Sequence, residues 1–222
     1  PKALLDCPKY GAINIHASLL PKLRGGAPIH HAIIDGYDKT GITIMYMNEK
    51  MDEGDIILQK ETLITDDDTT EKLHDRLSII GRDLILDAIP MIVSGNINVI
   101  KQNNDEATYG YNIRRDDERI DFSKSKRDIF NQIRGLNSFP GAYCILNNKI
   151  LKVWSSEIGF SNKGKYNGEI INIYNDGIGI KCLDGEIILK EVQLEGKKKQ
   201  NARDFINGYK DNLLGSILNE KC

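Results

Sequence analysis

Short apolar runs alternate with polar and glycine-containing stretches along the first part of the chain. Runs rich in apolar and β-branched residues at 12–15, 41–47 and 56–59 predict strands. Pro28 suits the first turn of a helix, because its missing N–H is not needed there, and we expect that helix over 29–34. The first hundred residues therefore begin as short strands separated by loops and one short helix.

A long amphipathic helix follows these strands. Asp68, with Glu71 three residues later, is a typical helix start, and apolar residues then recur at helical spacing up to Pro90. The residues on that apolar face are Leu73, Leu77, Ile80, Leu84 and Ala88. Strands that interleave with helices indicate an α/β sheet with helices on its faces.

The second part of the chain has a different pattern. Residues 101–112 are polar and lack periodicity, which is typical of a linker. Ser125 can cap a helix over 126–134. Turn signals such as Asn-Asn and Asp-Gly then separate five short apolar runs, at 142–146, 150–154, 168–174, 177–182 and 186–192. Strands at this spacing suggest a small closed sheet, and we favour an OB-type barrel.

Composition places the chain among soluble globular proteins. Its 222 residues are 40% hydrophobic and 28% charged, with no apolar window near the roughly 18 residues of a membrane span. The start lacks the basic and apolar regions of a secretory signal. The cysteines are far apart and show no metal-site pairing, so we expect a reduced cytoplasm; they are Cys7, Cys144, Cys182 and Cys222.

The distribution of charge and the first residues of the chain each lead to a further expectation. Residues 1–112 hold 11 basic and 17 acidic residues, a net charge of −6, whereas residues 113–222 hold 19 and 15, a net charge of +4. A basic second half is a hint of a polyanionic partner, although ordinary surface variation also produces such a difference. Pro1 is not an initiator methionine, and too few residues precede position 11 for a βαβ unit of about 30, so we expect a missing front section.

Asn14 and His16 are the first candidates for chemistry. Two residues apart on a predicted strand, they point to the same face. An Asn amide and a His N–H can both stabilise a developing oxyanion, and ligands of open α/β sheets bind at strand ends. A hydrogen-bonded structural pair is the alternative, because Asn and His often satisfy buried backbone groups.

The surrounding motifs resemble those of folate-dependent formyltransferases. The run Asn14-Ile-His-Ala-Ser-Leu-Leu-Pro-Lys-Leu-Arg-Gly25, followed by Ala27-Pro-Ile29 and Thr40-Gly-Ile-Thr43, is similar to the family's signature. Met51-Asp-Glu-Gly-Asp-Ile56 resembles the family's acidic loop. The resemblance implies the C-terminal part of a Rossmann-like formyltransferase domain, in which the N-terminal βαβ portion is missing.

The resemblance also implies roles for individual residues. Asn14, His16 and Asp52 match the family's catalytic residues. The first two would donate hydrogen bonds to the formyl oxygen, and Asp52 would orient the imidazole and help to take the amine proton, directly or through a water. The segment expected to contact the folate consists of Ser18, Leu19, Leu20 and Pro21.

Other readings of the acidic and glycine-containing loops are possible. Asp52, Glu53 and Asp55 could bind a metal, but they lack the spacing of a calcium loop, and we expect no metal cofactor. Gly25 and Gly26 could cradle a phosphate, yet neither common phosphate-binding motif is present. A loop that turns sharply beside a ligand explains these glycines more simply.

The second half resembles the C-terminal domain of methionyl-tRNA formyltransferases. Three stretches carry this likeness, at 119–123, 133–143 and 196–208. The last contains Lys197, Lys198 and Lys199, which could neutralise RNA phosphates or form an ordinary solvated loop. Arg24 could meet the tRNA end or pair with an acidic neighbour, and we favour the tRNA contact.

The sequence therefore predicts a catalytic domain over 1–100, a linker over 101–112 and an OB-like tRNA-binding domain over 113–222. The resemblance implies that the formyl group of 10-formyltetrahydrofolate moves to the amino group of methionyl-initiator tRNA in translation initiation. Expected partners are this tRNA and the folate, without a membrane, and we expect a cytoplasmic monomer. The alternatives are a UDP-amino-sugar formyltransferase and a fragment that binds tRNA without catalysing.

Overall fold

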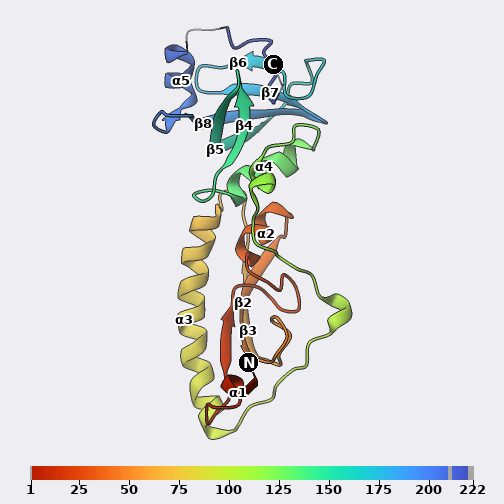
Figure 1. Cartoon of the computed structure of the whole chain (residues 1–222), viewed down its shortest axis with the longest axis vertical. Coiled ribbons are helices and arrows are strands. Elements are labelled where there is room, and N and C mark those ends of the chain that lie inside the picture. Colours follow the sequence, from red (N-terminus) through yellow and green to blue (C-terminus); the bar gives the residue numbers. More distant parts are fainter. Residues whose placement is uncertain (1, 210–211, 220–222) are drawn as a thin grey trace. The chain divides into compact units, whose positions relative to one another are not determined.

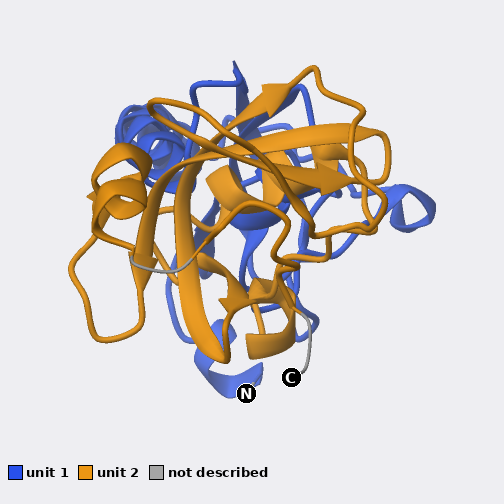
Figure 2. Ribbon diagram, turned by 90° about the horizontal axis from the view of Figure 1, so that it is seen from above, with its two compact units in different colours: residues 1–112 blue, residues 113–222 orange. Residues whose placement is uncertain are grey.

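The protein consists of two compact units, residues 1–112 and 113–222, in a computed structural model that describes residues 2–209 and 212–219 (Figures 1 and 2). Two sequence expectations lie outside the described residues, because they concern Pro1 and Cys222. The segment 101–112, expected to be a linker, is part of the first unit.

Unit 1 contains a three-stranded antiparallel sheet, in the order β1-β2-β3. Its strands are β1 (Ile13–His16), β2 (Lys39–Tyr46) and β3 (Ile56–Leu63). The three predicted strands are thereby confirmed, each shifted or extended by a few residues. The central strand β2 pairs His16 with Thr43 on one side and Thr43 with Gln59 on the other.

Two helices accompany this sheet, besides a short α1 (Lys2–Leu5). Helix α2 (Pro28–Ile34) begins at the predicted proline. Helix α3 (Thr70–Ser94) starts at the N-cap Thr69, whose side chain accepts a hydrogen bond from the backbone of Lys72. Among the described residues, no helix combines the length and apolarity needed to cross a lipid bilayer.

Both predicted ends of α3 need correction. Asp68 is not the N-cap; its carboxylate accepts hydrogen bonds from Arg76 at 2.8 and 2.9 Å and from the Thr65 backbone. Burial alone would raise the pKa of the Asp68 carboxyl, but the contacts with Arg76 and Thr65 together outweigh it, and the pKa is lowered. Pro90 lies inside the helix, which continues to Ser94 and ends at the C-cap Gly95, a residue in the left-handed conformation. The helix can continue past Pro90 because a proline removes only one intrahelical hydrogen bond.

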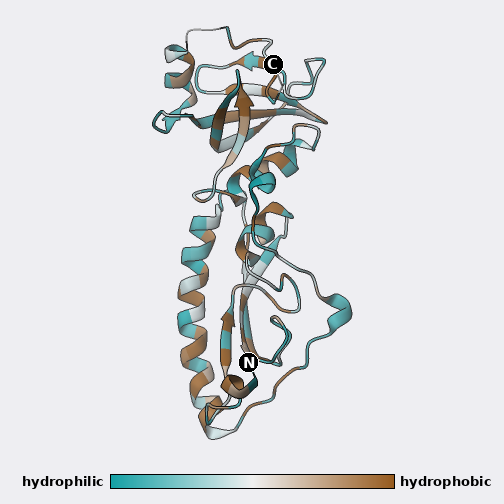
Figure 3. Cartoon of the chain, viewed as in Figure 1, coloured by the Kyte–Doolittle hydropathy of each residue, from teal (hydrophilic) through white to brown (hydrophobic). Residues whose placement is uncertain are grey.

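The core of unit 1 lies between α3 and the sheet. Leucines of α3 repeat at helical spacing and pack against buried isoleucines of β2 and β3. The buried members are Ile33, Ile42, Ile44, Ile57, Leu73, Leu77, Leu84, Ala88 and Ile92. Figure 3 shows α3 carrying both hydrophobic and hydrophilic residues, as the sequence pattern predicts for a helix with one buried face.

Unit 2 contains a six-stranded antiparallel sheet. The strands follow the order β4-β5-β8-β7-β6, and β9 pairs with β8. Their bounds are β4 (Ala142–Leu146), β5 (Lys149–Gly159), β6 (Ile170–Ile173), β7 (Ile178–Cys182), β8 (Gly185–Leu194) and β9 (Gln200–Asn201). The five predicted strands are confirmed, while β9 is a pairing that the apolar pattern did not predict.

Unit 2 also contains helices, and each unit has a short 3₁₀ turn. Helix α4 (Lys126–Gly135) is capped by Ser125, as predicted, and α5 (Ala202–Gly208) is capped by Asn201. Single 3₁₀ turns lie at Asn104–Glu106 in unit 1 and Arg115–Glu118 in unit 2.

The sheet of unit 2 is open along its strand ladder, with β4 and β6 at its two ends. A closed barrel is therefore absent from the strand pairing of the described residues. The segment 216–219 nevertheless bonds to both edge strands: the Ile170 N–H donates to the Ser216 carbonyl and the Asn219 N–H donates to the Ile145 carbonyl, each at 2.8 Å.

Candidate active site

The candidate site begins where β1 ends. His16 is the last residue of β1 and is 6% exposed. After it the chain enters residues 17–27, called here the glycine loop, which returns to place the Leu23 carbonyl oxygen 2.9 Å from His16 Nε2. A carbonyl oxygen only accepts hydrogen bonds, so Nε2 carries the proton and donates it. The other ring nitrogen, Nδ1, is left for chemistry.

Asp52 approaches that free nitrogen from the turn between β2 and β3. Its carboxylate Oδ2 lies 3.7 Å from His16 Nδ1 and accepts a hydrogen bond from the Gly25 N–H at 2.8 Å. Asp52 has a φ of +53°, a left-handed backbone that few non-glycine residues adopt. The turn thus directs the carboxylate toward the glycine loop and the imidazole.

The imidazole and carboxylate are suited to proton transfer and to charge stabilisation. The 3.7 Å separation exceeds a hydrogen bond, so the two groups are close without being tied to each other. Their side chains are 7% and 16% exposed, which shields the pair from bulk water and strengthens its electrostatic interaction. A protonated Nδ1 could donate to an oxygen that gains negative charge.

Asn14 lies on the same face of β1 as His16, because the two are separated by one residue. It is half-buried and its cross-strand partner is Met45, which is 1% exposed. The strand therefore brings Asn14 to the side on which His16 meets Asp52, as the sequence pattern predicts for residues two apart on a strand.

The segment expected to contact the folate packs onto the sheet. The Ser18 hydroxyl donates to the Lys22 carbonyl, and the side chain is almost fully buried. Leu20 is 3% exposed, and its backbone N–H donates to Thr43 Oγ1 at 3.1 Å. Leu19 and Pro21 stay half-exposed and are the side chains of this segment that a ligand can reach.

Two polar residues of the sheet hold this segment in place. Thr43 Oγ1 donates to the Ser18 carbonyl at 2.6 Å, and the Gln59 amide donates to the Leu20 carbonyl at 2.9 Å and to Thr43 Oγ1 at 2.8 Å. Thr43 belongs to one of the motifs that resemble the formyltransferase signature. The sequence pattern indicates for Gln59 only a place on a strand.

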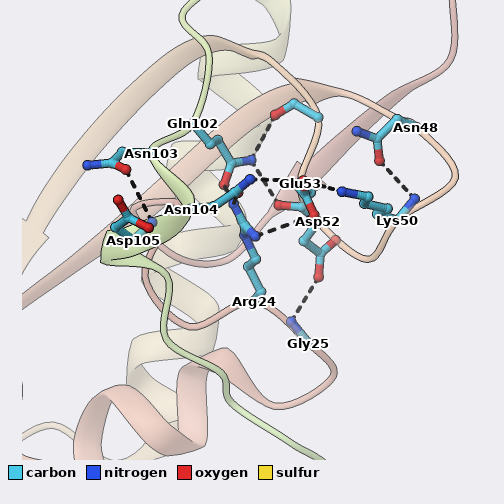
Figure 4. A network of polar contacts seen from close by, with 11 residues as sticks. Arg24, Gly25, Asn48, Lys50, Asp52, Glu53, Gln102, Asn103, Asn104 and Asp105 are labelled. Atoms are coloured by element: carbon cyan, nitrogen blue, oxygen red, sulfur yellow. Dashed lines mark hydrogen bonds and ion pairs between the residues drawn. The ribbon is translucent and has the colours of Figure 1, made fainter.

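Arg24 lies at the centre of a polar network beside the turn that carries Asp52 (Figure 4). The residue is 1% exposed, and its guanidinium donates to Gln102 Oε1 at 2.7 and 3.1 Å and to Asn104 Oδ1 at 2.8 Å. Glu53 lies 3.8 Å away, and its pKa is lowered mainly by a hydrogen bond from Lys50. The contacts of Arg24 are thus internal to the chain and offer no support for the predicted tRNA contact.

Gln102 and Thr108 are the residues near the site that the sequence pattern did not reveal. Both lie in the polar segment expected to be a linker, which has no periodicity that could single them out. Gln102 donates to the carbonyls of Asp52 and Gly54, and Thr108 Oγ1 accepts from the Leu23 N–H at 2.9 Å.

The three lysines predicted to contact RNA lie in unit 2 after β8. All are exposed, and Lys199 pairs with Glu191 at 2.9 Å. Together with Phe205 and Tyr209 they line a surface cavity of about 290 Å³. Exposed lysine side chains can neutralise phosphates.

The part of the chain that the structure describes contains no group of three or more His, Cys, Asp or Glu side chains arranged to hold a metal ion. Asp52 and Glu53, considered above as metal ligands, instead contact Gly25 and Lys50.

Comparison with known proteins identifies related families for both units. Residues 1–89 match the family model described as "Formyl transferase", and residues 112–210 match "Formyl transferase, C-terminal domain". Curated relatives are methionyl-tRNA formyltransferases. The one from Geobacillus sp. (strain WCH70) is 51% identical over 94% of this chain and 66% of its own length. Those from Bacillus velezensis and Staphylococcus aureus (strain MW2) are 48% and 45% identical, over 99% and 98% of this chain and 69% and 70% of their lengths. This chain spans about two thirds of the length of these relatives.

Solved structures of formyltransferases are also similar. An N-formyltransferase from Helicobacter canadensis, in complex with folinic acid and dTDP-3-aminofucose, is 26% identical with a TM-score of 0.65. The match covers 80% of this chain and 65% of that one. HypX from Aquifex aeolicus, 17% identical with a TM-score of 0.68 over 90% of this chain and 36% of that one, shares the fold.

Arg24→Ala tests whether this guanidinium is structural. The substitution removes the buried guanidinium together with the charged hydrogen bonds that it donates to Gln102 and Asn104, so we expect the free energy of unfolding to fall by about 3 kcal/mol. Urea denaturation followed by circular dichroism measures this loss. Lys22→Ala, in the same loop and with its described hydrogen bonds made by backbone atoms, is the control and should cost under about 1 kcal/mol. Equal stabilities of the two variants would contradict an internal role for Arg24.

Proposed function

The chain belongs to the methionyl-tRNA formyltransferase family, and we propose that it transfers a formyl group from 10-formyltetrahydrofolate to the amino group of methionyl-initiator tRNA. The observation that carries this proposal is the approach of His16 Nδ1 and the Asp52 carboxylate from two separate segments. Relatives that bear this activity are about half identical to the chain over nearly all of its length.

The reaction requires stabilisation of an oxyanion. The amine lone pair attacks the formyl carbon, a C–N bond forms, and the carbonyl oxygen takes on negative charge. When the bond to the folate nitrogen breaks, that charge returns to the carbonyl, the folate nitrogen leaves with the bonding electron pair and takes up a proton, and the attacking nitrogen loses one. In our proposal the Asn14 amide and the free nitrogen of His16 donate hydrogen bonds to the oxygen.

Asp52 has two tasks in this proposal. Its carboxylate, 3.7 Å from Nδ1, orients the His16 imidazole, whose doubly protonated form donates from Nδ1 to the formyl oxygen. Its second carboxylate oxygen can accept the proton that leaves the attacking ammonium, directly or through a water. The bond from Gly25 holds Oδ2 in place while this occurs.

The folate would lie against residues 18–21. Ser18 and Leu20 are already buried in contacts with the rest of unit 1, so we assign the direct folate contacts to Leu19, Pro21 and the backbone between them. The structure from H. canadensis that carries folinic acid supports a folate donor for this chain.

The tRNA would be bound largely by unit 2. This part of the chain is basic, and Lys197, Lys198 and Lys199 are exposed beside a cavity. The bonds from residues 216–219 to β4 and β6 support an OB-type arrangement, a fold that often binds nucleic acids. Because methionyl-tRNA is made where translation occurs, we propose a cytoplasmic protein, and we propose that it is a monomer.

A nucleotide-linked amino sugar is the second candidate acceptor. It is supported by the H. canadensis neighbour, whose structure contains dTDP-3-aminofucose. A third possibility is that this chain by itself binds tRNA without transferring the formyl group. The higher identity to methionyl-tRNA formyltransferases favours the tRNA acceptor.

Formylation assays with 10-formyltetrahydrofolate separate these functions. We expect formyl transfer to methionyl-initiator tRNA and at least 100-fold slower transfer to a nucleotide-linked amino sugar, when both are offered to the full-length protein. Filter binding of tRNA to this chain, measured in parallel, distinguishes binding from catalysis. Faster transfer to the sugar would mean that an amino sugar, not methionyl-tRNA, is the acceptor. Binding of tRNA without formyl transfer, by both this chain and the full-length protein, would support the binding-only function.

Asn14→Ala should lower kcat about 10²–10³-fold, because an oxyanion donor contributes roughly 2.7–4 kcal/mol to the transition state. Single-turnover formylation of saturating methionyl-tRNA measures this change. Asn48→Ala, which removes an exposed amide that bonds to the Lys50 N–H, is a matched control that should leave kcat within about threefold. An unchanged kcat in Asn14→Ala would remove Asn14 from the oxyanion role.

Replacement of Lys197, Lys198 and Lys199 by alanine should weaken tRNA binding and flatten its salt dependence. The slope of log Kd against log salt should fall by about 1 for each phosphate that the variant no longer neutralises. A double substitution of the exposed Lys163 and Lys165 in the same unit is the control. An identical slope for the wild-type and the triple variant would place these lysines away from the RNA.

A further inference from the structure

The segment 102–110, called here the strap, lies along the glycine loop. Arg24 is its main backbone partner: the Arg24 N–H donates to the Thr108 carbonyl at 2.9 Å, and the Gly110 N–H donates to the Arg24 carbonyl at 2.8 Å. The Ala27 N–H donates to the Gly110 carbonyl at 2.9 Å. Gly25 has a φ of +112°, and a Cβ there would lie 2.8 Å from the Gly110 carbonyl oxygen, so the strap and the loop need this glycine.

Gln102 extends from this strap into the turn that carries Asp52 (Figure 4). Its amide nitrogen donates to the Asp52 carbonyl at 2.8 Å and to the Gly54 carbonyl at 2.7 Å. Its oxygen accepts two hydrogen bonds from the guanidinium of Arg24. A side-chain amide has two N–H groups and one oxygen with two lone pairs, so every position of Gln102 is used.

These contacts join the two segments that meet at His16. On one side Gln102 fixes the backbone of Asp52, whose left-handed conformation is otherwise unfavourable. On the other side it fixes Arg24, whose neighbour Gly25 holds the Asp52 carboxylate. One amide therefore constrains both the main chain and, through Arg24, the side chain of Asp52.

We propose that Gln102 is a positioning residue for the formyl transfer, which sets the direction of the Asp52 carboxylate toward His16. The inference rests on the proposed function. Gln102 does not act on the reacting atoms, and its effect passes through Asp52. A displacement of about 1 Å in a catalytic group can cost on the order of 100-fold in rate, so the removal of this amide should be visible in kcat.

Gln102→Glu is the most selective substitution. A carboxylate of the same shape still accepts from Arg24, but it places negative oxygens against the carbonyls of Asp52 and Gly54 in place of the two N–H donors. The strap keeps its bonds to the guanidinium while the Asp52 turn is no longer anchored. Gln102→Met removes both kinds of hydrogen bond at a similar volume and serves as a second variant.

Asn104→Ala is the matched control, because Asn104 belongs to the same network without contacting Asp52. It accepts from Arg24 at 2.8 Å and donates to Glu53 at 3.0 Å. If the network mattered only for the stability of unit 1, substitutions at Asn104 and Gln102 would reduce activity alike.

The experiment measures formyl transfer to methionyl-tRNA by variants of the full-length protein, with circular dichroism to confirm folding. We expect Gln102→Glu and Gln102→Met to lower kcat about 10- to 100-fold, with KM for folate and tRNA within about threefold of wild type. Asn104→Ala should stay within about threefold in both constants. Equal losses at Gln102 and Asn104, or a wild-type kcat for either folded Gln102 variant, would overturn the proposal.

A double-mutant cycle with Asp52→Asn tests the route of the effect. If Gln102 acts through the Asp52 carboxylate, adding Gln102→Glu to Asp52→Asn should lower kcat by less than about twofold further. A further decrease as large as that of Gln102→Glu alone would mean a general structural role. Full activity of Asp52→Asn by itself would refute the proposed function of the site, an outcome distinct from failure of the Gln102 inference.

Discussion

The hydrogen bond from the Gly25 N–H to the Asp52 carboxylate is the contact on which the site depends. It joins a loop that follows β1 to a turn between β2 and β3, two segments that the sheet alone does not bring together. Because the carboxylate then lies 3.7 Å from His16 Nδ1, the same bond sets the geometry of the proposed acid–base pair. Backbone donors fix a carboxylate more rigidly than mobile side chains do.

Three other parts of unit 1 stabilise this contact: the core, strand β2 and the strap. The core between α3 and the sheet fixes the strands, and β2 places Thr43 beneath the glycine loop. The strap closes the arrangement from the other side through the buried guanidinium of Arg24. Loops at binding sites are commonly mobile. The glycine loop is restrained instead, because its backbone is hydrogen-bonded to the strap and to β2.

Much of the fold follows from periodicity, and most of the site from motifs. Strands, helix caps and the proline at the start of α2 have local physical causes, which a sequence displays. The predicted end of α3 is wrong because packing on either side of Pro90 outweighs the one hydrogen bond that the proline removes. The strap is unpredictable for a different reason: its hydrogen bonds join Gln102 and Thr108 to residues about 50 to 85 positions away, and polar side chains in an aperiodic segment give no sign of such partners. The sequence also does not reveal that Arg24 is buried, because a charged side chain is normally expected at the surface.

The most direct test is a structure of the full-length protein with a non-transferable analogue of 10-formyltetrahydrofolate. The account predicts that the formyl oxygen lies within about 3.2 Å of a donor on Asn14 and of the free nitrogen on His16, with the Asp52 carboxylate still bonded to Gly25. A formyl group bound elsewhere, or an Asp52 that turns away from the imidazole when the folate binds, would contradict it.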